Sequence, residues 1–306
     1  MIISTPRTLS LCKNRSILAK TNPQSGGPED WFTENNLQQL GMQSFSFDFF
    51  VNWEKNKIAN CLWFKRFIDI DTDILTSTDN WEQMLEKHLI EHEGLLQLKN
   101  IFTFGKEQKL RIDFLLFNEH NWNENKEIIY ARLISEDSFK IKAVSLDELK
   151  NKIRVGTGQP FKIRKGLTYS TSKLECNLSI TETPYPGDAD ILIKNKEDNG
   201  FKLIEFKKHN LKTPISEEKL SNYYPHKDAS KYNRLNLLKK FLSNTQLYTV
   251  YYTTDSRFET KIELNAYSDS GLMEGPSILL DSPKDKSDIN YIYKYLSNCV
   301  EFFNSN

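Results

Sequence analysis

Two apolar segments in the second half of the chain, residues 190–193 and 201–208, flank a polar stretch and have the pattern of a β-hairpin. Both segments are rich in Ile, Leu and Phe, as strands are. The polar stretch ends in Asn199 and Gly200, which tolerate the positive φ angles of tight hairpin turns. The pattern therefore predicts two antiparallel strands joined near residue 199.

The alternation of side chains brings charged residues of the two strands to one face. A period of two places Leu203, Glu205 and Lys207 on the same face of the second strand. Asp188 and Asp190 share a face of the first strand by the same rule. If the hairpin pairs as predicted, the carboxylates and the lysine converge on one side of a small sheet.

Clustered carboxylates repel one another, and a hard divalent cation relieves that repulsion. Mg²⁺ takes oxygen ligands and keeps several waters, which suits an Asp/Glu pair with open coordination positions. A lysine two positions after the glutamate can orient or deprotonate an attacking water, or stabilise charge on a phosphate. A hairpin with a solvated, charged face is the alternative. We favour the metal site because Glu205 and Lys207 interrupt an otherwise apolar strand.

The residues PGDAD at 186–190 and EFK at 205–207 resemble the motif of the PD-(D/E)XK nuclease superfamily. This resemblance covers roughly residues 167–253. It implies an α/β (α+β) fold with a restriction-endonuclease-like αβββαβ core in the C-terminal half. It also implies metal-dependent hydrolysis of phosphodiester bonds, with Mg²⁺ as the cofactor and Mn²⁺ as the alternative.

The same motif assigns the roles that we expect at the site. Asp190, Glu205 and Lys207 are the expected catalytic residues, and Asp188, Asp190 and Glu205 the expected metal ligands. Asp190 is the first choice because it abuts the apolar strand, and Asp188 is either a second ligand or the true one. The family often adds a glutamate from a preceding helix. Glu148 is one candidate, and Glu175 is another only if its segment is not a strand.

The region around the hairpin completes the expected core. Alternating apolar residues over 174–180 predict a strand, which would make a three-stranded meander with the hairpin. Asp228 is placed to cap a helix with an apolar face that includes Phe241, and residues 246–253 read as a strand. Further strands are expected at 260–266 and 277–280, and a terminal helix at 288–303.

The first half of the chain predicts a mixed α+β domain. We expect strands on both sides of residues 56–59 and at 110–117, 127–133 and 139–144, with one helix over the segment WEQMLEKHLIEHEGLLQL. Ser145 opens a capping box before a short helix. Residues 156–160 are the candidate boundary. The expected organisation is a flexible arm at 1–30, an N-terminal domain of unknown role at 31–155 and a nuclease-like domain at 156–306, without internal repeats.

Charge is balanced overall but not locally. The chain has 41 basic and 41 acidic residues, which argues against indiscriminate binding to nucleic acid. Residues 201–240 hold ten basic and four acidic residues, beside the predicted site, where a phosphate backbone would lie. We expect nucleic acid to contact basic side chains there, namely Lys208, His209, Lys212, Lys231 and Arg234.

Composition limits the remaining function classes. The chain has no apolar run long enough to span a membrane and no apolar core of a secretory signal at its start, so a cytoplasmic protein is expected. Its four cysteines are widely spaced, which predicts buried free thiols rather than a zinc site or a disulfide scaffold.

The sequence therefore predicts a metal-dependent nuclease, with DNA favoured as substrate and a role in restriction or phage defence. A non-catalytic nucleic-acid-binding or scaffold module with the same fold is the alternative, as is a nuclease that cleaves RNA. The N-terminal domain is expected to select a target, bind a partner protein or form a homo-oligomer.

Overall fold

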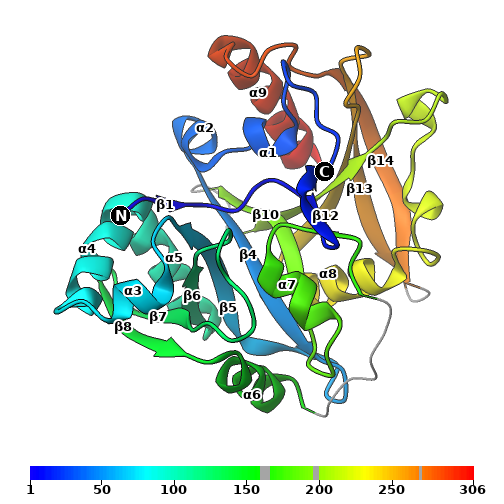
Figure 1. The fold of residues 1–306 in the computed structure, drawn as a ribbon. Helices are drawn as coiled ribbons and strands as arrows, with labels where there is room; N and C mark the ends of the chain where they lie inside the picture. The colour runs from blue at the N-terminus through cyan, green and yellow to red at the C-terminus, as the bar shows by residue number, and fades with distance from the viewer. Residues whose placement is uncertain (159–165, 196–199, 269–270) are drawn as a thin grey trace. The chain divides into compact units, whose positions relative to one another are not determined.

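Two compact units, each built from two separate stretches of chain, make up the mixed α+β structure. The structure, a computed structural model, describes residues 1–158, 166–195, 200–268 and 271–306 (Figure 1). Unit 1 comprises Met1–Ala19 and Phe47–Asp188, and unit 2 comprises Lys20–Ser46 and Ala189–Asn306. Strand pairing is mostly antiparallel. Within the described residues, no helix is long and apolar enough to cross a membrane.

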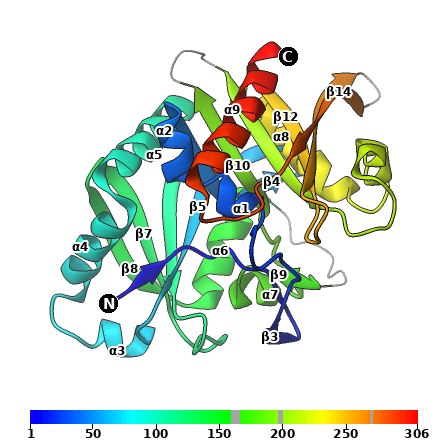
Figure 2. The same cartoon turned by 90° about the horizontal axis from the view of Figure 1, so that it is seen from above.

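The sheet of unit 1 has the order β4-β5-β6-β7-β8. Strands β5 and β6 are parallel and are connected by helices α3 to α5, while the other neighbours are antiparallel. Figure 2 shows α4 and α5 on one side of this sheet and α6 on the other. The bounds are β4 Met42–Asn52, β5 Lys57–Ile68, α3 Thr72–Thr76, α4 Trp81–Glu93, α5 Leu95–Gln108, β6 Arg111–Phe117, β7 Ile128–Ser135, β8 Ser138–Val144 and α6 Leu146–Thr157.

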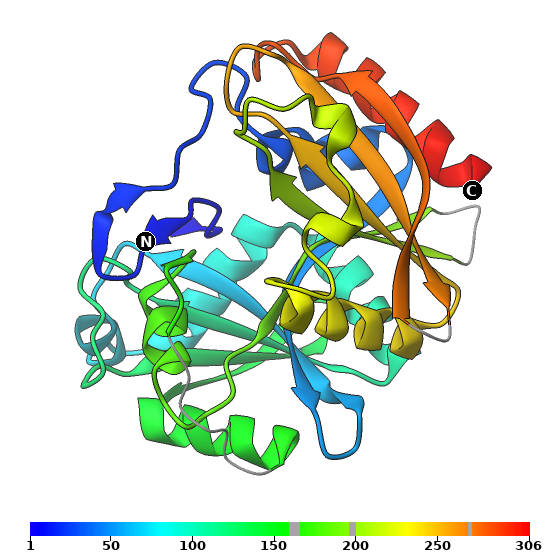
Figure 3. The same cartoon turned by 90° about the vertical axis from the view of Figure 1, so that its right-hand side faces the viewer.

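The sheet of unit 2 has the order β10-β11-β12-β13-β14. Strands β11 and β12 are parallel and are connected through helix α8, and the other neighbours are antiparallel. Figure 3 shows α8 and α9 on opposite faces of this sheet. The bounds are α1 Pro28–Trp31, α2 Glu34–Gln39, β10 Gly187–Asn195, β11 Phe201–Lys208, η1 Ile215–Glu217, η2 Leu220–Asn222, α8 Ala229–Leu242, β12 Thr245–Tyr252, β13 Glu259–Ser268, β14 Gly271–Asp281 and α9 Ile289–Ser305.

The two units repeat one topology, although we expected no repeat from the sequence. Each has an antiparallel hairpin, a helical crossover to a parallel strand, two more antiparallel strands and a closing helix. The long segments of the units begin at Phe47 and Ala189, from 47 to 189, which is 142 positions. The repeat lies in the order and direction of the elements, and the residue types that fill them differ too much to reveal it.

The compact units do not follow the boundaries expected at residues 30 and 155. Residues 20–46 contribute Trp31, Phe32 and Leu37 to the buried core of unit 2, which also includes β10 to β13 and α9. Helix α7 (Lys173–Ser179) packs instead into the core of unit 1, beside residues of β5, β6 and α6. Residues 159–160 of the expected boundary region lie outside the described residues.

The expected strand over 174–180 is wrong, because this segment forms helix α7. Ser172 caps the helix by accepting a hydrogen bond from the Glu175 N–H at 3.2 Å. Leu174 and Leu178, four positions apart, are both buried on one helix face. The same residues satisfy a period of two, so the apolar pattern alone did not separate helix from strand.

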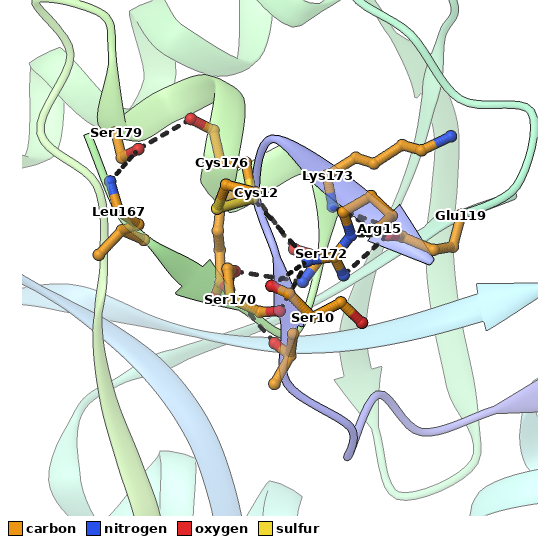
Figure 4. Close-up of a disulfide and its surroundings, with 12 residues drawn as sticks. Ser10, Cys12, Arg15, Glu119, Leu167, Ser170, Ser172, Lys173, Cys176 and Ser179 are labelled. Carbon is orange, nitrogen blue, oxygen red and sulfur yellow. Dashed lines mark hydrogen bonds and ion pairs between the residues drawn. A yellow bond between two sulfur atoms is a disulfide. The ribbon is translucent and has the colours of Figure 1, made fainter. Parts of the chain in front are cut away.

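The first residues of the chain are fastened to unit 1, which contradicts the expected flexible arm. β1 (Ile3–Ser4) pairs with β5, and a small sheet has the order β3-β2-β9, with β2 Ser10–Leu11, β3 Asn14–Leu18 and β9 Tyr169–Ser170. A disulfide joins Cys12 to Cys176 on α7, so these cysteines are not the free thiols that we expected, whereas Cys61 and Cys299 are free and buried (Figure 4).

Arg15 and Glu119 reinforce this attachment beside the disulfide. The Arg15 guanidinium donates to the Ser170 carbonyl at 2.8 Å and forms an ion pair with Glu119 at 3.0 Å (Figure 4). The N–H of Lys173, at the start of α7, donates to the same glutamate. The disulfide and Arg15 therefore attach the N-terminal strands to β9 and α7.

Most other expected elements agree with the structure to within a few residues, but β14 begins six residues before the strand expected at 277–280, and one helix is divided. The helix expected over WEQMLEKHLIEHEGLLQL is split into α4 and α5 at Gly94, whose φ of +78° lies in the left-handed region that glycine adopts without strain. The hairpin forms from β10 and β11 as expected, and its turn residue Asn199 lies outside the described residues.

A fragment of residues 150–306 tests the division into units. It lacks Trp31, Phe32 and Leu37 and therefore leaves part of the unit 2 core open, which costs about 3 kcal/mol or more of stability for each large side chain removed. We expect the fragment to show no cooperative thermal unfolding by circular dichroism, whereas the full chain unfolds cooperatively. Cooperative, native-like unfolding of the fragment would instead support the boundary expected from the sequence.

Candidate functional site

The β10-β11 hairpin brings Asp190 and Glu205 side by side. The antiparallel register pairs Ile191 with Ile204, and its continuation by one residue places Asp190 opposite Glu205. The Phe206 N–H donates to Asp190 Oδ2 at 2.7 Å, which fixes the aspartate against the second strand. The structure thus confirms that these two carboxylates converge.

Glu205 is the most deeply buried charged group of the site. Its exposed fraction is 0%, and neither of its oxygens accepts a hydrogen bond from the described residues. Its Oε1 lies 2.9 Å from Lys207 Nζ and 2.8 Å from Lys231 Nζ. A buried carboxylate needs compensating charge, and here two ammonium groups supply it at one oxygen.

Lys231 bridges the two carboxylates. It stands in the first turn of α8, and its Nζ lies 3.6 Å from Asp190 Oδ1 as well as beside Glu205. We expected this side chain to contact nucleic acid. The structure directs it into the carboxylate pair, where it is a counter-ion.

Lys207 is held in its charged form. Burial disfavours the ammonium, but the Glu205 carboxylate, Tyr232 and the hydrogen bond to Asp228 together outweigh this effect, and the pKa of Lys207 is raised above its ordinary value of 10.5. Its Nζ also bonds Asp228 Oδ2 at 2.8 Å and lies over the rings of Tyr223 and Tyr232. A lysine held as the ammonium cannot accept a proton from water.

Helix α8 supports the site in a way that the sequence only partly indicated. Asp228 precedes the helix as expected, but its side chain makes no capping hydrogen bond and binds Lys207 instead. Tyr232, Leu235 and Leu238 are buried as expected, whereas Phe241 is 38% exposed. The buried face of α8 therefore covers the side of β11 that carries Leu203 and Glu205.

Glu29 on α1 interacts electrostatically with Lys231, which the sequence did not indicate. Glu29 keeps an exposed surface. The protein around it nevertheless raises the pKa of Glu29 by desolvation, whereas the charges of Lys208 and Lys231 lower that pKa. Burial also raises the pKa of Tyr252, with further contributions from Glu29, Asp190 and Glu205. Glu29 therefore shares the electrostatic environment of the other two carboxylates.

The two helix glutamates considered from the sequence both lie in unit 1. Glu148 on α6 forms ion pairs with Lys142 and Lys152. Glu175 on α7 contacts Lys65. Glu29 follows Gly27 and Pro28, a helix-start signal, but it stands 161 positions before Asp190, counted from 29 to 190, so no local pattern linked it to the hairpin.

The remaining expected residues are distributed differently. Asp188 is exposed, lies in unit 1 and contributes to the raised pKa of Asp48. His209 is 1% exposed, with Nδ1 2.7 Å from Glu218 and Nε2 2.8 Å from the Thr213 carbonyl oxygen, so it is a buried residue and does not fit the expected contact with phosphate.

The three other basic residues stay near the surface. Lys208 Nζ donates to the Lys20 carbonyl at 2.9 Å. Lys212 is exposed, and Arg234 is half-buried on α8. Their expected contact with nucleic acid remains a prediction.

Unit 1 contains a related cluster at the equivalent positions of its sheet. The β4-β5 register pairs Asp48 with Trp63, as Asp190 faces Glu205 in unit 2, and Lys65 follows two residues later, as Lys207 does. Lys65 Nζ lies 2.9 Å from Asp48 Oδ2 and also contacts Glu175 and Thr171. The aspartate and lysine are thus repeated, whereas Trp63, 2% exposed, stands where unit 2 has Glu205.

Within the described parts of the chain, no three His, Cys, Asp or Glu side chains come together closely enough to hold a metal ion by themselves. Asp190 and Glu205 lie opposite each other on the described strands β10 and β11, and the cation that bridges them is an ammonium. Any metal at this position would therefore draw its other ligands from water or substrate.

No protein-family model matches the chain, and no curated protein is significantly similar to it. Among solved structures, a match was found to the crystal structure of the sex pheromone staph-cAM373 precursor, at 12% sequence identity. It covers 78% of this chain and 76% of that one, with a TM-score of 0.18.

The unit 1 cluster generates a prediction on pH dependence. Burial raises the pKa of Asp48 from 3.8 to about 7, against the opposing charge of Lys65. The folded protein then binds the Asp48 proton more tightly than the unfolded chain, and this contribution to stability is lost as pH rises through about 7. Asp48→Asn cannot titrate, so its stability relative to the wild type should be more favourable at pH 8 than at pH 5.

Denaturant unfolding at the two pH values measures this difference. A stability difference between Asp48→Asn and the wild type that stays constant from pH 5 to pH 8 would show that the aspartate titrates at its ordinary pKa.

Proposed function

We propose that unit 2 is a metal-dependent nuclease unit whose active site contains Asp190, Glu205 and Lys207. The observation that carries this proposal is the Glu205 carboxylate, which is fully buried, accepts no hydrogen bond from the described residues and is paired only with ammonium groups. Burying such a group costs stability, and active sites are where that cost is commonly found.

The donor set fits a hard divalent cation. Asp190 and Glu205 offer oxygen ligands on adjacent strands, and Mg²⁺ is usually bound through one or two carboxylates, several waters and substrate phosphates. Mn²⁺ shares this preference for oxygen. Bound there, the metal would lower the pKa of a coordinated water and polarise the phosphate.

The side chains around the carboxylates would handle the charge of the substrate. Because Lys207 is held as the ammonium, it would stabilise negative charge on the phosphate and not deprotonate the attacking water. Asp228 fixes its position at 2.8 Å, and the rings of Tyr223 and Tyr232 line its path. Proton removal from water then depends on the metal.

The topology of unit 2 supports the same proposal. In chain order it contains α2, the start of β4 (residues 42–46), β10, β11, α8 and β12, which is an αβββαβ sequence of elements. In the sheet, β4 neighbours β10, and β12 is parallel to β11. This order of elements favours the core implied by the resemblance to PD-(D/E)XK nucleases, with β4 in place of the strand expected at 174–180.

The side chains of the unit 1 cluster favour a non-catalytic role for that unit. Trp63 replaces the metal-binding glutamate there, and Lys65 is already enclosed by Asp48 and Glu175. We propose that unit 1 is the scaffold or binding module of the protein, and unit 2 the cleaving one. DNA is the substrate that we favour, in restriction or phage defence.

Matched substitutions at equivalent positions test the proposal. Asp190→Asn and Glu205→Gln should each lower cleavage of plasmid or linear DNA by at least about 100-fold, because each removes a metal ligand. Lys207→Met should lower the rate while leaving metal binding intact. Asp48→Asn and Lys65→Met are the unit 1 controls, and we expect both to cleave at the wild-type rate when circular dichroism shows them folded.

The assay uses plasmid, linear duplex, single-stranded DNA and RNA, with Mg²⁺ and with EDTA. Cleavage that persists in EDTA, or that survives Glu205→Gln, would refute the metal-dependent mechanism. Loss of cleavage in the unit 1 controls but not in the unit 2 variants would place the activity in unit 1 and contradict the proposal.

A further inference from the structure

Lys231 is the site residue whose position the nuclease motif does not explain. It comes from α8, outside the hairpin, and its Nζ lies 2.8 Å from Glu205 Oε1 and 3.6 Å from Asp190 Oδ1. A cation that bridges these two carboxylates stands where a divalent metal would bind them. The side chain of Lys231 is 29% exposed, so it borders solvent and has space to leave.

The charges of the cluster do not accommodate both cations. Asp190, Glu205 and Asp228 carry three negative charges, and Lys207 and Lys231 carry two positive ones, so a divalent cation would leave the group with net positive charge. Lys207 is further fixed by Asp228, whereas Lys231 pairs with Glu205 and Asp190 from a side chain that borders solvent. A divalent cation at the same oxygens would be repelled by the Lys231 ammonium at close range. Metal binding therefore requires Lys231 to move.

Unit 1 provides an internal comparison. Its Asp48 and Lys65 match Asp190 and Lys207 by sheet register, and Lys65 is its bridging cation. The second carboxylate of the unit 1 cluster is Glu175 from α7, whereas unit 2 has Glu205 at the sheet position of Trp63, with the ammonium groups of Lys207 and Lys231 beside it. In unit 2 the two carboxylates are therefore on adjacent strands, and a second lysine lies beside them.

We propose that Lys231 is a displaceable counter-cation of the metal site. Without metal it neutralises Asp190 and Glu205; when Mg²⁺ binds, the lysine leaves the carboxylates and binds the phosphate of the nucleic acid. A phosphate that reaches the metal supplies the negative charge that the displaced ammonium has lost. Metal and nucleic acid therefore bind cooperatively, through a coupling that depends on Lys231. This inference rests on the proposed function of unit 2.

Calorimetric titration of the full chain with Mg²⁺ alone, in the absence of nucleic acid, tests this role. Lys231→Met removes the competing cation, and we expect it to bind Mg²⁺ about 5-fold or more tightly than the wild type. Lys231→Arg keeps the charge and should bind Mg²⁺ with about the wild-type affinity. Lys240→Met, which removes the same charge from an exposed position of α8, is the matched control and should leave the affinity unchanged.

A second titration measures the coupling. Ca²⁺, like Mg²⁺, is a hard cation that takes oxygen ligands. The wild type should bind a DNA duplex more tightly in the presence of Ca²⁺ than in its absence, and Lys231→Met should lose most of this enhancement. Equal or weaker Mg²⁺ affinity in Lys231→Met, while Glu205→Gln abolishes Mg²⁺ binding, would overturn the role of Lys231 and leave the metal site in place. Absence of Mg²⁺ binding in the wild type would overturn the proposed function and this inference with it.

Discussion

The site of unit 2 depends on a single buried carboxylate, that of Glu205, and on the ammonium groups that surround it. A carboxylate with no exposed surface and no hydrogen bond from the described residues is tolerated only where compensating charge is close. Lys207 and Lys231 supply that charge, and Asp228 in turn fixes Lys207. The equivalent position of unit 1 holds Trp63, which needs no counter-charge and instead packs in the core. One topology thus produces a closed ion-pair cluster in unit 1 and a site with a replaceable cation in unit 2.

Local patterns were sufficient to predict the hairpin and most strands of both units. The alternation in β11 correctly placed Glu205 and Lys207 on one face, because successive side chains of a strand point to opposite faces. Asp228 was correctly placed before α8, although its side chain bonds Lys207 and makes no cap. Predictions of this kind succeed where one side of an element is buried and the other is not.

Features that depend on contacts distant in sequence could not be predicted. α7 satisfies both a helical and a strand period, and its packing in unit 1 decides between them. Trp31, Phe32 and Leu37 pack in the core of unit 2 because residues 20–46 belong to that unit, and no spacing in the sequence records that. The Cys12–Cys176 disulfide spans 164 positions, and a pairing between isolated cysteines is not encoded in their spacing. The repeated topology is likewise invisible to residue comparison, since Trp63 and Glu205 share a position but no chemistry.

The central claim is that Asp190 and Glu205 bind a divalent cation and that unit 1 does not. Crystals of the full chain grown with Mn²⁺, measured at the manganese absorption edge, would locate the ion directly by its anomalous signal. We expect one peak in contact with Asp190 and Glu205. Lys231 Nζ should then lie away from Glu205. A peak at Asp48 and Glu175, with none at Glu205, would contradict the central claim.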